Sequence, residues 1–99
     1  MVTREKPETV VLKLPDRCTI ADVGALHAQL AELLAAPGVQ EIRIDCAEVI
    51  AIDGASLQCL AAAVKSTREG QRLVFTHPTP ELLKAVEWTG MAALITPAS

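Results

Sequence analysis

Few side chains in this sequence are of the types that perform acid–base or nucleophilic chemistry. The histidines are His27 and His77, far apart along the chain, and the nucleophile types nearest to an unusual sequence motif are Ser56 and Cys59. A catalytic site needs such groups to converge, and no known nucleophile motif surrounds Ser56 or Cys59. A glycine-rich phosphate loop is missing as well. The sequence therefore predicts no catalytic residue and no enzymatic activity.

The cysteines do not form a metal-binding or disulfide pattern. Cys18, Cys46 and Cys59 are odd in number and have no Cys-x-x-Cys spacing, which suits a reduced cytoplasm better than a zinc site or a disulfide framework. We interpret all three as buried, small apolar groups. No metal site and no cofactor are expected.

The motif Ile52-Asp53-Gly54-Ala55-Ser56-Leu57-Gln58 is typical of a strand that runs directly into a helix. Asp53 stands at the N-cap, where its carboxylate can accept a hydrogen bond from the backbone N–H of Ala55 or Ser56. Gly54 and Ala55 give this helix start almost no side-chain cover. Spare N–H groups at an uncovered helix start can receive an anion or the backbone of a partner. Two interpretations stay open, a helix cap alone or a docking edge.

Alternating hydrophobicity predicts the strands that lead to this corner, and helical spacing predicts the segments between them. Strands are expected at residues 9–14, 41–46 and 72–76, with a short extension at 49–52. Helices are expected at residues 20–36, from 54 to about 69, and from Pro80, capped by Thr79 and closed by Gly90. Strands that alternate with helices favour crossover connections and parallel pairing.

One predicted strand carries a row of polar side chains. Glu41, Arg43 and Asp45 should face solvent, whereas Ile42 and Ile44 should be buried. A parallel strand covered on both faces would be almost continuously apolar. The sequence therefore predicts an α/β fold with a sheet of about four strands and helices mainly on one face.

The length and composition limit the organisation and the partners. The 99 residues should form one domain, 1–99, with a loose lead-in at 1–8 and a loose tail at 96–99, while Met91 to Ile95 should pack back as a turn or strand. A net charge of -3 and 2% aromatic content argue against nucleic acid as a partner. With no secretory signal and no membrane-spanning apolar run, we expect a cytoplasmic protein that is not embedded in a membrane.

Several motifs together resemble the STAS domain family of anti-sigma factor antagonists. They are Asp53-Gly54-Ala55-Ser56-Leu57, Arg72-Leu73-Val74-Phe75, Pro78-Thr79-Pro80-Glu81-Leu82-Leu83 and Trp88-Thr89-Gly90-Met91, and the likeness covers Val10 to Ile95. It implies a small mixed sheet backed by helices, no enzyme activity, and docking to a protein partner. That partner would be a kinase or anti-sigma factor, a phosphatase, a chemotaxis signalling protein or a transporter subunit.

The resemblance also bears on the pathway. The run Leu14-Pro15-Asp16-Arg17-Cys18-Thr19-Ile20 is most similar to STAS proteins of bacterial chemotaxis-type signalling clusters. A related branch serves the cytoplasmic face of a phospholipid transporter, and we keep it as an alternative. A third possibility is a domain that binds a small ligand, either a nucleotide or a lipid.

The expected docking residues are Asp53, Gly54, Ala55 and Ser56. In the family the phosphate is carried by the second residue after the aspartate, and this position is Ala55 here. Ser56 is one step further into the helix, where its hydroxyl points about 100° away from the usual direction. The resemblance therefore implies a docking surface without the usual phosphoacceptor, and with Ser56 as a weak substitute.

Overall fold

The structure, a computed structural model, describes residues 2–89 and is built around a four-stranded sheet. The strand order is β1-β2-β4-β6. β1 runs antiparallel to β2, whereas β2, β4 and β6 are parallel to one another. The strands span Val2–Lys6 (β1), Thr9–Lys13 (β2), Glu41–Asp45 (β4) and Arg72–Thr76 (β6). The predicted α/β fold with a mixed sheet of four strands is confirmed.

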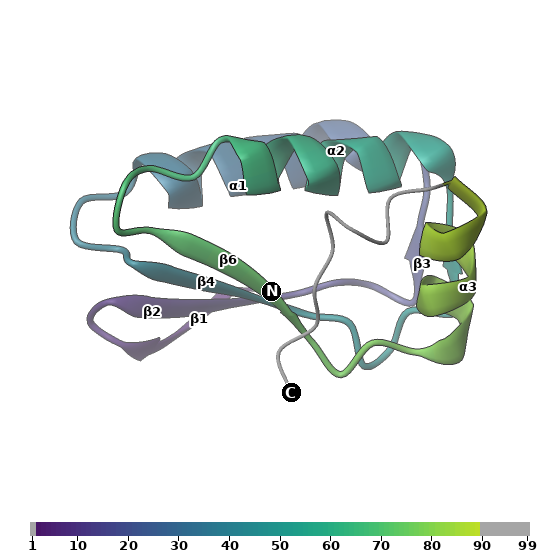
Figure 1. Ribbon diagram of the computed structural model, residues 1–99, viewed down its shortest axis with the longest axis horizontal. Helices are drawn as coiled ribbons and strands as arrows, with labels where there is room; N and C mark the ends of the chain where they lie inside the picture. The colour runs from purple at the N-terminus through teal and green to yellow at the C-terminus, as the bar shows by residue number, and fades with distance from the viewer. Residues whose placement is uncertain (1, 90–99) are drawn as a thin grey trace.

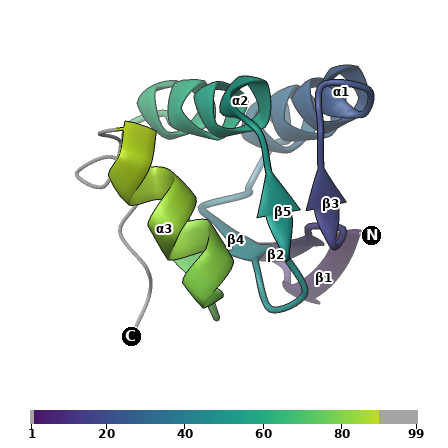
Figure 2. The same ribbon diagram turned by 90° about the vertical axis from the view of Figure 1, so that its right-hand side faces the viewer.

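Two helices cover one face of this sheet, as Figure 1 shows. They are α1 (Val23–Ala35) and α2 (Gly54–Lys65), which also pack against each other. A second, two-stranded parallel sheet joins β3 (Arg17–Cys18) to β5 (Ala51–Ile52) at one end of the molecule. The third helix, α3 (Pro80–Thr89), lies against β5 at that end (Figure 2). No helix of residues 2–89 covers the other face of the main sheet, which confirms the one-sided arrangement.

The core lies between the main sheet and the helices. Among the described residues it consists of aliphatic side chains together with Cys18, Cys46 and Phe75, which is 1% exposed. Ile42 and Ile44 of β4 are fully buried, as the alternation predicts. Leu57 and Leu60 attach α2 to this core, and Leu30 attaches α1. These anchors determine where the start of α2 lies relative to the strands.

The prediction that Glu41 faces solvent is wrong, because this residue is only 8% exposed. Its carboxylate accepts hydrogen bonds from Arg43 Nε at 2.7 Å and Arg72 Nε at 2.6 Å. Burial raises the pKa of Glu41, but the two guanidinium groups outweigh it and hold the pKa below its ordinary value. Arg43 and Asp45 are half-buried. Long neighbouring side chains can thus cover an acid on an open sheet face.

The loose lead-in expected at residues 1–8 is also corrected. Residues Val2–Lys6 form β1, which pairs with β2 through a turn at Pro7 and Glu8. All five residues of β1 are exposed, so this edge strand has no hydrophobic alternation to reveal it. The first helix begins at Val23, three residues later than predicted. The expectations for Gly90, Met91 to Ile95 and the 96–99 tail lie outside the described residues.

Two smaller expectations can be compared directly. Thr79 caps α3 as predicted, since its Oγ1 accepts a hydrogen bond from the Leu82 N–H at 3.2 Å. Cys18 and Cys46 are buried, but Cys59 is only half-buried. Cys59 lies with residues of α1 and α2 beside a hollow between these helices, which leaves its side chain partly open.

Candidate functional site

The corner between β5 and α2 is organised by Asp53. This residue has an extended backbone, with φ -97° and ψ 172°, so the chain turns directly from the strand into the helix. Its Oδ1 accepts a hydrogen bond from the Ser56 N–H at 2.9 Å. The predicted helix cap is therefore confirmed, with Ser56 and not Ala55 as the donor.

Asp53 also holds a second segment that the sequence did not reveal. Its Oδ2 accepts a hydrogen bond from the Ile20 N–H at 2.6 Å, and its own N–H donates to the Cys18 carbonyl at 3.0 Å. Ile20 is 33 residues away along the chain and lies in the loop between β3 and α1. The two oxygens of the Asp53 carboxylate therefore fix this loop to the start of α2.

These hydrogen bonds stabilise the ionised form of Asp53. The Ser56 N–H is the largest cause that holds the pKa of Asp53 below its ordinary value of 3.8, and the Ile20 N–H adds to it. Desolvation acts in the opposite direction. The Ser56 hydroxyl is near enough to lower the pKa further, but its Oγ does not reach hydrogen-bonding geometry.

Asp53→Asn is expected to remove part of the acid sensitivity of the fold. Because the folded pKa is depressed, the ionised group stabilises the fold above the unfolded pKa, and this contribution disappears as the pH falls through the folded pKa. Thermal unfolding from about pH 7 to about pH 3 should show a wild-type loss of stability below about pH 4 that is smaller in Asp53→Asn. Glu41→Gln is the comparison variant, because the fold also holds the pKa of Glu41 below its ordinary value. Identical pH profiles for wild type and Asp53→Asn would contradict the role of this carboxylate.

The start of α2 is open beside this anchor. Gly54 is exposed, and a Cβ placed on it would meet no heavy atom within 4 Å. Ala55 is half-buried. The small residues therefore leave real space at the first turn, as the docking interpretation requires.

Ser56 differs from the other expected docking residues because it is only 1% exposed. Its Oγ has no hydrogen-bond partner among residues 2–89. The hydroxyl of Ser56 is therefore turned away from solvent. At the surface, the corner consists of Asp53, Gly54 and Ala55.

The sequence pattern did not reveal an exposed apolar residue, Ile20, that lies beside the corner. Ile20 is 70% exposed, more than Ile50, Leu83 or Val2, the other large apolar side chains that are exposed in the described chain. Its spacing with Val23 and Leu26 indicated the buried face of a helix starting at residue 20. Since α1 begins only at Val23, Ile20 belongs to a turn and points outward.

The histidines and the metal-ligating side chains of residues 2–89 do not gather into a reactive cluster. His27 is exposed on α1, and His77 lies in the turn after β6 with a positive φ of 52°. No three metal-ligating side chains of this part of the chain are placed to hold an ion. Within the same range, none of the helices has the length and apolar character needed to cross a membrane.

Comparison with known proteins gives one family and a set of similar structures. The family model described as "Mlab, STAS domain" matches residues 1–96. No curated protein matches the chain. The unphosphorylated anti-sigma factor antagonist SpoIIAA is 16% identical with a TM-score of 0.80, over 100% of this chain and 87% of that one. The phosphorylated form of SpoIIAA, described as a Bacillus cell fate determinant, is 16% identical with a TM-score of 0.76, over 100% and 90%.

The two structural likenesses establish the fold, and the family model covers nearly the whole sequence. The fold that they share with this chain extends over its whole length. The chain belongs to the STAS domain family.

Proposed function

We propose that this domain is a non-enzymatic protein-interaction module of bacterial signal transduction, similar in role to an anti-sigma factor antagonist. It acts in the cytoplasm, and it docks its partner through a surface formed by Ile20, Asp53, Gly54 and Ala55, which we call the corner surface. The similarity to SpoIIAA, which its description names an anti-sigma factor antagonist, supports this class of function.

The single observation that carries the proposal is the exposed Ile20 fixed beside an open helix start. The Ile20 side chain is 70% exposed, so its replacement should not change the stability of the fold. In a complex, the same side chain offers an apolar anchor for a partner. Asp53 holds its backbone in place through the 2.6 Å hydrogen bond. The corner surface is therefore preorganised, which reduces the entropy lost on docking.

The partner we favour is a signalling protein, either a kinase of the anti-sigma type or a component of a chemotaxis-type cluster. A subunit of a phospholipid transporter is the second candidate, since the family model carries the description "Mlab". Both partners would use the same surface. Their identification by co-purification separates the two.

Co-purification from the native host, followed by mass spectrometry, tests the proposed function. We expect Ile20→Ser to reduce recovery of the specific partner strongly, whereas Ile50→Ser should leave recovery unchanged. Ile50 is a matched control because it is also an exposed isoleucine, 51% exposed, but it lies before β5, whereas the corner follows that strand. Equal recovery of the partner by wild type and Ile20→Ser would show that docking occurs on another surface.

We also propose that this domain is not switched by phosphorylation at the corner. Ala55 has no hydroxyl, and the Ser56 hydroxyl is buried where a kinase cannot align it for phosphoryl transfer. Intact-mass spectrometry of protein from the native host should show no species removed by phosphatase. A phosphate on Ser56, with altered signalling in Ser56→Ala, would overturn this prediction, whereas phosphorylation gained by Ala55→Ser would support it.

A further inference from the structure

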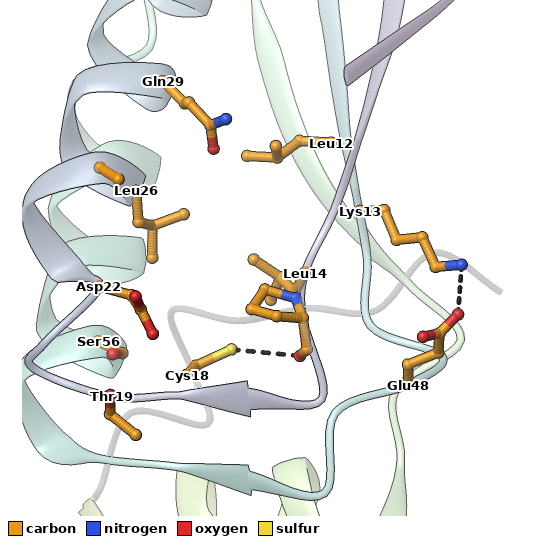
Figure 3. A pocket seen from close by; sticks show the side chains of 12 residues that line it. Leu12, Lys13, Leu14, Cys18, Thr19, Asp22, Leu26, Gln29, Glu48 and Ser56 are labelled. Atoms are coloured by element: carbon orange, nitrogen blue, oxygen red, sulfur yellow. Dashed lines mark hydrogen bonds and ion pairs between the residues drawn. The ribbon is translucent and has the colours of Figure 1, made fainter. Parts of the chain in front are cut away.

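A cavity of about 510 Å³ lies between the first half of α1 and the end of β2, next to the corner surface (Figure 3). Its walls are mainly aliphatic and come from Leu12, Leu14, Pro15, Ala25 and Leu26. Sites that bind small molecules commonly have volumes of about 300–1,000 Å³ and mostly apolar walls with few polar groups. The cavity has the size and lining of such a site.

One polar group in the lining, the Ser56 hydroxyl, lacks a hydrogen-bond partner among the described residues. Ser56 lines this cavity from α2 and is 1% exposed, and its Oγ has no hydrogen-bond partner among the described residues. A buried hydroxyl without a partner costs free energy that a ligand hydroxyl or amide could recover. Gln29 and Thr19 add further polar groups to the lining.

The charges of the lining select against anions. Asp22 and Glu48 contribute carboxylates, and the one cationic side chain in the lining, Lys13, forms an ion pair with Glu48. A phosphate or carboxylate in the cavity would meet no cluster of cations to balance it. The lining therefore favours an uncharged ligand over a nucleotide or a fatty acid.

The cysteine in the lining does not point to covalent chemistry. The Cys18 Sγ donates a hydrogen bond to the Pro15 carbonyl at 3.6 Å, drawn as a dashed line in Figure 3. Burial raises the pKa of Cys18 to about 11, so the thiol stays protonated. A ligand would be held by packing and hydrogen bonds.

From this combination we propose that the cavity binds a small uncharged amphiphile, with an alkyl body against the leucines and one hydroxyl or amide group paired with Ser56 Oγ. This inference is independent of the proposed docking function. It assigns a ligand site to a face of α1 and β2 that the corner surface does not use.

Titration of ¹⁵N-labelled protein with 1-octanol and, separately, with octanoate tests the proposal. The two probes share a chain and differ in the charge of the head group. We expect 1-octanol to shift amide signals around Leu14, Leu26 and Ser56, with at least a tenfold higher affinity than octanoate. Signals that shift equally with both probes, or that are spread over the surface, would overturn the proposal.

Variants separate the cavity from general apolar binding. Ser56→Ala should lower the 1-octanol affinity about three- to tenfold, the loss typical of one hydrogen bond, while the fold remains at least as stable. Ala25→Phe should block binding by filling the cavity. Ala31→Phe is the matched control, because Ala31 is also exposed on α1 but does not line this cavity. Unchanged 1-octanol affinity in Ser56→Ala or in Ala25→Phe would contradict the assigned site.

Discussion

Gly54→Glu is expected to weaken partner binding by about 1–3 kcal/mol, or roughly 5- to 150-fold, without destabilising the domain. The new side chain projects into open space, because a Cβ at Gly54 meets no atom within 4 Å. A charge at this position must be desolvated or displaced when a partner covers the corner surface. The substitution therefore acts on the interface and leaves the core unchanged.

The stability of Gly54→Glu should equal or exceed that of the wild type. An acid in the first turn of a helix is favourable by about 0.3–1 kcal/mol. Replacing a glycine in an ordinary conformation also lowers the entropy of the unfolded chain. Calorimetry with the identified partner and thermal unfolding of the free domain measure the two effects separately.

Two controls isolate the cause of the weakened binding. Gly54→Ala adds a methyl group without charge and should bind the partner almost as tightly as the wild type. Ala62→Glu puts the same charge on an exposed position of α2 far from its start and should leave binding unchanged. Wild-type affinity in Gly54→Glu would move the interface away from the corner surface.

Leu57→Ala is expected to lower the free energy of unfolding by about 2–5 kcal/mol. Leu57 is 1% exposed and belongs to the core between the helices and the sheet. Its backbone N–H also donates to the Asp53 carbonyl at 3.1 Å, within the first turn of α2. Truncation therefore leaves a cavity directly below the corner that Asp53 organises.

This loss is a large part of the total stability of a small domain, which is typically about 5–15 kcal/mol. Urea denaturation should give a lower midpoint with an unchanged slope. The neighbouring exposed residue supplies the control, since Gln58→Ala should change stability by less than about 0.5 kcal/mol. A cost below about 1 kcal/mol for Leu57→Ala would mean that the start of α2 is not fixed by this core contact.

The elements with a strong hydrophobic pattern could be predicted from the order of the amino acids alone. The alternation of Ile42 and Ile44 with polar neighbours predicted both the buried strand and the uncovered sheet face. The cap residues Asp53 and Thr79 predicted the starts of α2 and α3. These features could be predicted because each depends on interactions within a few residues along the chain.

The features that depend on contacts between distant segments became visible only in the folded chain. Strand β1 is exposed throughout and is held by backbone pairing with β2, so its side chains gave no signal. The burial of Glu41 requires Arg72 from a neighbouring strand. A pattern read along the chain contains no information about such partners.

The candidate site shows the same division between local and long-range contacts. Sequence reasoning found Asp53 and the small residues after it, but it placed Ile20 at the start of a helix and Ser56 at the docking surface. The second Asp53 oxygen binds the Ile20 N–H across 33 residues, which fixes the loop before α1 and leaves the Ile20 side chain outside. The same packing buries Ser56 at 1% exposure beside a cavity. Local chemistry thus determined the cap, whereas a long-range hydrogen bond and the packing of α1 on β2 decided which side chains reach the surface.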